Sequence, residues 1–265
     1  MSIEKHDQSD NTVSETPEQL AQYRHAFEQR LADINQRIEQ VCARSGRARG
    51  DVRLLPVSKT VDTSRLRQAV SAGCHQLGEN KVQEAMDKAQ ELSDLPVQWS
   101  IIGHLQTNKA KYVARFAHEV QSLDSLKLAE TLDRRLQLEG RALDVYVQVN
   151  SSGEASKYGL APDDVPKFMT SLSPFSSLRV RGLMTLAVFS ADDVTVRECF
   201  VRMRTLRGRL REELPDPSLC QELSMGMSGD FEIAIEEGST CVRVGQALFG
   251  PRALPDSYYW PGETK

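Results

Sequence analysis

The sequence predicts an α/β fold, a single (β/α)8 or TIM barrel, and three observations indicate it. Short apolar runs typical of buried strands alternate with amphipathic helical segments. The strand–helix unit recurs along 265 residues, and eight such units in about 250 residues is the size of a barrel. No segment rich in Gly, Pro or Ser divides the chain, so we expect one domain. A doubly wound open sheet is the alternative fold, but no Gly-x-Gly-x-x-Gly motif follows the first predicted strand.

The sequence suggests a barrel between two tails. Residues 1–17 are polar and contain no apolar segment, so they are expected to form a flexible tail rather than a secretory signal. Residues 18–252 are expected to form the barrel, and residues 253–265 a C-terminal tail that is too short to be a second domain.

A long amphipathic helix is predicted before the first strand. Thr16 and Pro17 suit its N-cap and its first helical position. Apolar residues then recur at three-and-four spacing from Leu20 to Val41, and Ser45-Gly46 ends the helix. The strands that follow are predicted over 53–58, 74–77, 97–102, 119–122, 143–150, 178–185, 221–223 and 240–244, and the helices over 64–71, 81–92, 108–116, 125–139, 162–172, 192–213 and 229–237.

The composition excludes several classes of function. A net charge of −4 leaves no basic stripe of the kind that nucleic acids need. No apolar stretch is long enough to span a membrane. The five cysteines are scattered and form no Cys-x-x-Cys pair, so neither a metal site nor a disulfide framework is expected. A reducing cytoplasm is the expected compartment, and the lack of a long exposed apolar stripe favours a monomer.

The first predicted strand ends on a lysine, Lys59. In a parallel barrel, functional side chains lie at the carboxyl ends of the strands. Partial burial lowers the pKa of an amine and makes it a nucleophile toward carbonyl groups. The alternative is a structural lysine whose stem packs while its ammonium group reaches water.

The two last predicted strands are followed by loops suited to an anion. Ser224 to Ser228 leads into a helix expected to start near Gly229, with Ser228 as its N-cap. Gly245-Gln246 follows the last strand. Barrels commonly hold phosphate at these two loops, where backbone N–H groups are free. Simple helix capping and a tight turn are the alternative interpretation.

Arg243 is unusual because it lies between Val242 and Val244 in a strand expected to be buried. A buried guanidinium needs a partner, which could be a carboxylate such as Glu79 or a ring nitrogen of a ligand. Because arginine keeps its proton, a pyridine nitrogen facing it would remain unprotonated. An amine, a phosphate cradle and a buried donor together match the aldehyde, phosphate and ring nitrogen of pyridoxal 5′-phosphate (PLP), with Lys59 holding the aldehyde as a Schiff base.

Several long motifs occur in the order found in one known family. The chain from about Leu20 to Arg252 resembles the YggS/PROSC family, the pyridoxal phosphate homeostasis proteins. The motifs that carry the resemblance are Val57-Ser-Lys-Thr60, Gly78-Glu-Asn-Lys-Val-Gln-Glu84, Ile102-Gly-His-Leu-Gln-Thr-Asn-Lys109, Gln148-Val-Asn-Ser-Ser-Gly153, Gly182-Leu-Met-Thr185, Ser224-Met-Gly-Met-Ser228 and Gly238-Ser-Thr-Cys-Val-Arg-Val-Gly245.

The resemblance implies a barrel of PLP fold type III, like the N-terminal domain of alanine racemase without the second domain. It also implies the role of each residue in the site. Lys59 matches the Schiff-base lysine and Arg243 the arginine facing the pyridine nitrogen. The matching phosphate loops contain Ser224, Ser228, Gly245 and Gln246, and Asn80 and Met184 match positions beside the cofactor. No catalytic residue and no metal ligand is implied.

The resemblance further implies a role in intracellular PLP (vitamin B6) homeostasis and amino-acid balance, with PLP-dependent apo-enzymes as potential recipients. Racemases of this fold use a second domain that closes the site and supplies a tyrosine base, whereas this chain spends its length on the barrel. A PLP carrier or regulator, with at most trace racemase-like activity, is therefore expected. His104 could be proposed as a base, although a histidine that packs a loop is the commoner case. The alternatives are a small PLP-dependent amino-acid racemase and a Schiff-base aldolase that acts without PLP.

Overall fold

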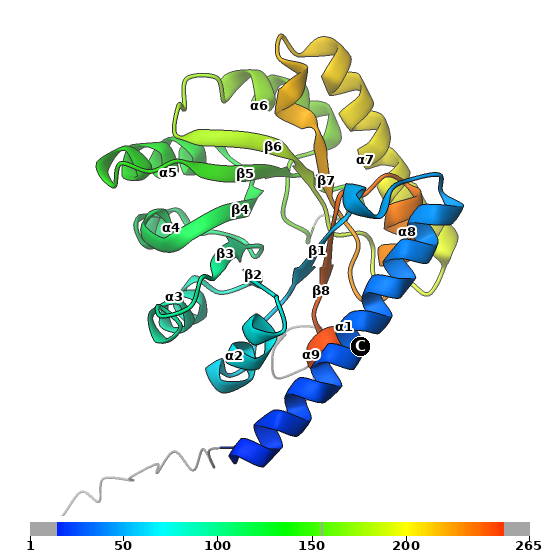
Figure 1. Ribbon diagram of the computed structural model, residues 1–265. Helices are drawn as coiled ribbons and strands as arrows, with labels where there is room; N and C mark the ends of the chain where they lie inside the picture. The colour runs from blue at the N-terminus through cyan, green and yellow to red at the C-terminus, as the bar shows by residue number, and fades with distance from the viewer. Residues whose placement is uncertain (1–14, 155, 252–265) are drawn as a thin grey trace, which may run out of the picture.

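The computed structural model describes residues 15–154 and 156–251. Its core is one sheet of eight parallel strands in the order β1-β8-β7-β6-β5-β4-β3-β2. Helices surround this sheet on its outer face (Figure 1). The strands are β1 (Arg53–Pro56), β2 (Gln76–Glu79), β3 (Gln98–Ile101), β4 (Ala117–Leu123), β5 (Leu143–Gln148), β6 (Leu178–Met184), β7 (Glu222–Ser224) and β8 (Cys241–Val244).

The helices follow the strands as the alternating pattern predicts. Four 3₁₀ turns, over Arg49–Asp51, Thr107–Lys109, Pro162–Asp164 and Pro217–Cys220, complete the described elements. The helices are α1 (Pro17–Arg44), α2 (Thr63–Ser71), α3 (Val82–Glu91), α4 (Ala110–Phe116), α5 (Leu126–Leu138), α6 (Val165–Ser171), α7 (Asp193–Glu213), α8 (Phe231–Glu236) and α9 (Gln246–Phe249). All predicted strands and helices are confirmed within a few residues, whereas α9 was not predicted.

The sheet closes on itself, so the predicted barrel is confirmed and the doubly wound alternative is wrong. Strand β1 pairs with β8 along its whole length, from Arg53↔Cys241 to Pro56↔Val244. On its other side β1 reaches β2 through a single bridge between Val57 and Gly78, extended by a bond from the Ser58 amide to the Gly78 carbonyl (2.9 Å). An open sheet would leave β1 and β2 as edge strands that do not pair with each other.

Strand β5 illustrates how the barrel wall separates two environments. Val145 and Val147 are fully buried in the apolar cluster that the strands form with the outer helices. Tyr146 lies between them and its hydroxyl bonds to Arg53 of β1 and to Glu222 of β7, so it points into the barrel. Successive side chains of a strand face opposite ways. The apolar core therefore lies outside the sheet, and the barrel interior is largely polar.

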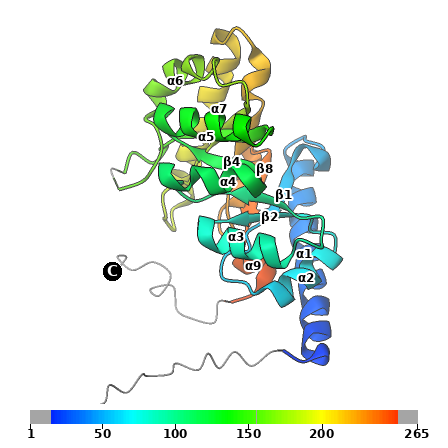
Figure 2. The ribbon, with the colours of Figure 1, turned by 90° about the vertical axis from the view of Figure 1, so that its left-hand side faces the viewer.

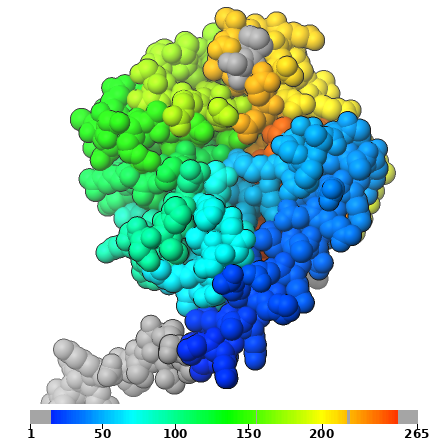
Figure 3. Space-filling view, in the orientation of Figure 1, coloured from blue at the N-terminus to red at the C-terminus, as the bar shows by residue number. Residues whose placement is uncertain are grey.

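Helix α1 runs along the outside of the barrel and packs against α2, α8 and α9 (Figures 1 and 2). Figure 3 shows it in blue beside α2 in cyan. Thr16 and Gln19 form a capping box at its start, and Pro17 occupies the first turn, as predicted. Phe27 and Ile38 on its inner face are completely buried, so the helix covers the junction where the first and last strands meet.

The predicted tails lie almost entirely outside the described residues. Residues 1–14 and 252–265 belong to that undescribed part. Of the segment assigned to the N-terminal tail, Glu15 pairs with Arg65 of α2 at 2.6 Å, and Thr16 and Pro17 start α1. Within the described ranges, no helix is both long and apolar enough to cross a membrane.

Candidate functional site

Lys59 lies just after β1, at the carboxyl end of the barrel, and is half-buried. It lines a hollow of about 290 Å³ together with Gly245 and Gln246, which follow β8. The two strands are joined at this point by a bond from the Val57 amide to the Val244 carbonyl (2.8 Å). The predicted amine and one predicted phosphate loop are thus brought together, as parallel neighbouring strands require.

The loop after β7 depends on a glycine. Gly226 has a φ of +96°, a conformation that side-chain-bearing residues rarely adopt. A Cβ at this position would lie 2.6 Å from the Cβ of Ala234 in α8. The backbone of this loop therefore passes unusually close to the helix. Gly245 is similar but less extreme, because a Cβ there would lie 3.3 Å from the Val57 carbonyl oxygen.

The predicted capping role of Ser228 is wrong. Helix α8 begins at Phe231, two residues later than predicted, and Asp230 occupies the N-cap position. The Asp230 carboxylate turns back and accepts a hydrogen bond from the Met227 amide (2.5 Å). Ser228 is instead a half-buried loop residue, so its predicted phosphate contact would come from the loop and not from the first turn of the helix.

Arg243 is buried, with 3% of its surface exposed. Its guanidinium donates to the Ser224 hydroxyl (2.6 Å) and to the Thr185 carbonyl (2.7 Å). The suggestion that Glu79 pairs with Arg243 is wrong, because the Glu79 carboxylate pairs with Lys88 at 2.8 Å. Burial lowers the pKa of Arg243 from its ordinary value, yet an arginine keeps its proton at neutral pH. The charge therefore needs compensation from farther away.

A chain of hydrogen bonds inside the barrel connects Arg243 to a buried carboxylate. The Ser224 hydroxyl, which accepts from Arg243, donates to Gln121 Oε1 (2.6 Å). Gln121 Nε2 donates to Glu119 Oε1 (2.7 Å). Glu119 also accepts from Arg53 at the opposite end of the barrel (2.8 Å). One buried carboxylate thus serves Arg53 directly and Arg243 through two neutral groups, and hydrogen-bonded polar networks of this kind fix side-chain orientation.

The sequence reasoning missed Gln121 and Glu119. Both lie in the predicted strand over 119–122, and their alternate spacing places them on one face of it. That spacing of two polar residues in a short strand was the available signal. The role of Glu119 and Gln121 becomes visible only in the folded barrel, where they bond to Arg53 and Ser224 from distant parts of the sequence.

Asn80 and Met184 also lie at the carboxyl end of the barrel. Met184 is the last residue of β6, is fully buried, and is aligned with Ser224 of β7. Asn80 follows β2 and is half-buried. The site residues therefore come from loops and strand ends around the rim, but only Lys59, Gly245 and Gln246 line the same hollow.

His104 lies on the same rim, in the loop after β3. Its Nδ1 is 3.5 Å from Asp124 Oδ2, and its ring stacks on Tyr158 with 4.0 Å between the ring centroids. Both neighbours hold the imidazole in place from other loops. The histidine therefore packs the rim loops together, which was the commoner alternative considered from the sequence.

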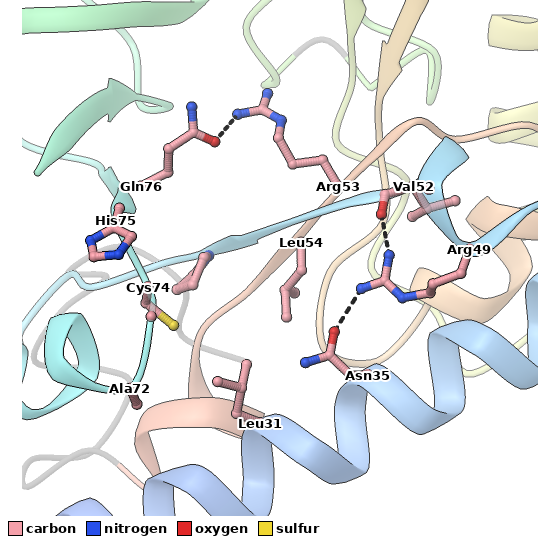
Figure 4. A pocket seen from close by; sticks show the side chains of 13 residues that line it. Leu31, Asn35, Arg49, Val52, Arg53, Leu54, Ala72, Cys74, His75 and Gln76 are labelled. Atoms are coloured by element: carbon pink, nitrogen blue, oxygen red, sulfur yellow. Dashed lines mark hydrogen bonds between the residues drawn. The ribbon is translucent and has the colours of Figure 1, made fainter.

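A larger hollow of about 630 Å³ lies elsewhere, between α1 and the start of β1 and β2. Figure 4 shows Leu31 and Asn35 from α1 on one side, and Arg53 bonded to Gln76 on the other. This hollow is at the amino end of the strands, opposite Lys59. Two pairs of its polar side chains are bonded, Arg49 with Asn35 (2.6 Å) and Arg53 with Gln76 (2.8 Å). It contains none of the predicted site residues, so we do not regard it as the candidate site.

The fold and the rim residues define the class of protein. A family model described as "Alanine racemase, N-terminal domain" matches residues 10–253. An alanine racemase from Corynebacterium glutamicum shares the fold with a TM-score of 0.63 at 13% identity, where 89% of this chain covers 64% of that one. The chain is therefore a barrel of the alanine racemase N-terminal domain family.

Closer relatives narrow this assignment. A protein of Pseudomonas aeruginosa named "Pyridoxal phosphate homeostasis protein" is 42% identical over 223 residues, which is 84% of this chain and 94% of that protein. The structure of PipY from Synechococcus elongatus with PLP bound is 36% identical, with a TM-score of 0.74, and covers 84% of this chain and all of that one. This chain thus belongs to the pyridoxal phosphate homeostasis protein family.

The residues at the rim fit PLP. Gly226 and Gly245 bring backbone close to neighbouring elements where side chains would overlap or crowd them, which is how loops approach a phosphate. Arg243 is held by two acceptors, and Lys59 lines the hollow. Among the described residues, no cluster of His, Cys, Asp or Glu has the arrangement of a metal site.

Proposed function

We propose that this protein binds PLP covalently through Lys59 and takes part in PLP homeostasis, holding the cofactor instead of turning over a substrate. The observation that carries the proposal is the shared hollow of Lys59, Gly245 and Gln246. It places a half-buried amine beside a loop suited to phosphate. The names of the relatives and the PLP bound to PipY support the same assignment.

When bound, PLP supplies an aldehyde, a pyridine ring and a phosphate. The Lys59 amine would hold the aldehyde carbon covalently. Gly245 and Gln246, with the Ser224–Ser228 loop, hold the phosphate through backbone and hydroxyl donors. Asn80 and Met184 would lie beside the ring.

Arg243 supports holding over catalysis. As a permanent donor it keeps a facing ring nitrogen unprotonated. A ring without that proton is a weaker electron sink, so carbanions next to it are poorly stabilised. The hydrogen bonds to Ser224 and Thr185 fix the guanidinium. Its effect on a facing ring nitrogen is therefore a constant property of the site.

The proposal is tested by adding PLP to purified protein, reducing it with borohydride and mapping the product. We expect a visible absorption band that shifts on reduction, and a single stable adduct on Lys59. The Lys59→Ala variant should show neither. A wild-type protein without a band would contradict the proposal and favour an aldolase that uses the lysine alone. Racemisation of single-enantiomer amino acids at enzyme-like rates would favour a racemase.

We further propose that the protein is a cytoplasmic monomer that delivers PLP to apo-enzymes. The five cysteines are free and buried, which suits a reducing compartment. Light scattering would test the monomer. Transfer would be measured with an apo-enzyme in the presence of a PLP trap, where protection from the trap indicates direct delivery. Capture of the PLP by the trap, with loss of transfer to the apo-enzyme, would instead indicate simple release into solution.

A further inference from the structure

The backbone on each side of Lys59 is held by a pair of oppositely charged side chains from α3. The carbonyl of Ser58, just before Lys59, accepts a hydrogen bond from Lys88 Nζ (2.8 Å). The amide of Thr60, just after it, donates to Glu84 Oε1 (2.6 Å). Lys88 and Glu84 pair with each other at 2.6 Å, one turn apart on the helix. Both neighbours of Lys59 are therefore tied to one ion pair.

The conformation that this pair holds is unusual. Thr60 has a φ of +67°, and among the described residues it is the one non-glycine residue with a positive φ. A β-branched side chain is disfavoured in this region, so such a conformation persists only where surrounding contacts impose it. The bond from Thr60 to Glu84 is such a contact. Released from it, the segment would relax and Lys59 would change direction.

The charged side chains beneath this segment, Lys88 and Glu79, are also costly to bury. Lys88 is 6% exposed, and Glu79, its second carboxylate partner at 2.8 Å, is completely buried. One oxygen of Glu79 has no hydrogen-bond partner, and the other also accepts from the Ser58 hydroxyl (2.6 Å). Buried ion pairs rarely stabilise a fold more than apolar packing would. A role in fixing the local backbone around Lys59 explains why these charged side chains are buried at this position.

Lys88 itself is excluded as the amine that binds a carbonyl compound. An ammonium group has three N–H donors. In Lys88 these three meet Ser58 O, Glu79 Oε1 and Glu84 Oε1, all within 2.8 Å. No direction is left for attack, and the group is buried in the wall between β2 and α3. The three bonds therefore exclude Lys88 and favour Lys59 as the amine for carbonyl chemistry.

We propose that Glu84 and Lys88 are positioning residues that set the direction of the Lys59 amine by fixing the peptide groups on both sides of it. This role rests on the proposed function, since it concerns the lysine that would hold PLP. It predicts that geometry at Lys59 can be changed from α3 without touching any group that contacts the cofactor. The three residues Lys59, Glu84 and Lys88 then form one functional unit of loop and helix.

The first measurement uses the protein without PLP. In Glu84→Ala, amide hydrogen exchange at Thr60 should be at least about tenfold faster than in wild type, because a bond to a charged acceptor is lost. Asp87→Ala is the matched control, since Asp87 lies on the same helix, is exposed, and bonds only to Gln83 among the described contacts. It should leave exchange at Thr60 unchanged. Equal exchange in wild type and Glu84→Ala would overturn the proposed clamp.

The second measurement uses PLP and reads the absorption band as a function of PLP concentration and of pH. Glu84→Ala should bind PLP about tenfold or more weakly and shift the pH midpoint of the band, whereas Glu84→Gln, whose amide oxygen still accepts from Thr60, should recover most of the binding. A wild-type affinity and midpoint in Glu84→Ala would overturn the proposal. So would a Gln variant as weak as Ala, because lost charge would then explain the effect. Absence of a band in wild type would instead refute the proposed function, while the exchange comparison would still measure the clamp.

Discussion

Ser224 and Arg243 are bonded inside the barrel, with 2.6 Å between Ser224 Oγ and Arg243 Nη1. The hydroxyl both accepts this bond and donates to Gln121. It therefore links Glu119 to Arg243 through Gln121 without placing a negative charge in contact with the guanidinium. A carboxylate in direct contact would neutralise Arg243 more strongly, and the neutral link leaves its donors available.

Ser224→Ala should destabilise the protein and weaken PLP binding. The change removes the acceptor of Arg243 and the donor to Gln121, and leaving buried polar groups unpaired costs about 1–3 kcal/mol. Urea unfolding and the PLP band would measure the two effects. Ser71→Ala is the control, because the exposed Ser71 hydroxyl, among the described residues, bonds only to a carbonyl of its own helix. A Ser224→Ala variant as stable as wild type would argue against the bond chain.

Gly226→Ala should unfold at lower urea concentration than wild type. A Cβ at position 226 would overlap the side chain of Ala234, and an alanine there would also have to adopt the disfavoured φ of +96°. Backbone strain of this kind costs about 1–3 kcal/mol. Gly229→Ala, three residues along the same loop, meets no atom within 4 Å. It should leave stability nearly unchanged. Equal stability of the two variants would contradict the close approach of this loop to α8.

Glu236→Gln should lower stability at neutral pH but not in acid. Hydrogen bonds from Arg197 and Arg44 hold the pKa of the Glu236 carboxyl below its ordinary value of 4.5. A depressed pKa means that the folded state favours the charged form, so the stabilisation is present above 4.5 and is lost as the pH falls through the lower folded-state pKa. The difference in unfolding free energy between wild type and variant should therefore shrink in acid.

Urea unfolding across this pH range would check the prediction for Glu236. Glu130→Gln serves as a control, because Glu130 is an exposed carboxylate on α5. A difference for Glu236→Gln that grows in acid would have the wrong sign for an ion-paired carboxylate.

The native thiols should react slowly with an aromatic disulfide reagent at pH 8. All five cysteines are buried, and burial raises the pKa of Cys74 to about 11 and of Cys220 to about 12. The thiolate is the reactive form, so little of it is present. Cys74 is 9% exposed and lines the large hollow near α1, so it should react first. Rapid reaction of several thiols without denaturant would contradict this packing.

Much of the fold was predictable because each strand and helix carries its own periodicity. The position of Lys59, Gly245 and Gln246 at one rim followed from the parallel arrangement of strands. The partner of Arg243 could not be predicted, since the interior contacts join β1, β4, β7 and β8, and no local pattern encodes which polar side chains meet. The same holds for Lys88, whose helical spacing from Glu84 was visible although its bond to Ser58 was not.

The late start of α8 has a simple physical reason. Gly229 and Ser228 favour a helix boundary, but the Asp230 side chain bonds back to the Met227 amide and stabilises a turn in front of the helix. Aspartate competes with helical hydrogen bonding in this way. Sequence preference alone does not decide between a serine and an aspartate two residues apart.

The pairing of β1 with β8 has a consequence for biosynthesis. Arg53 and Cys241 are aligned although they are 188 positions apart, and on its other side β1 has a single bridge to β2. Domains tend to fold as units while the chain emerges from the ribosome. Lys59 emerges early, but the strand that holds it finds its full partner only when β8 has been translated. We therefore expect nascent chains that end before β8 to be unable to capture PLP. Binding of PLP would then show that β8 has been synthesised and paired with β1.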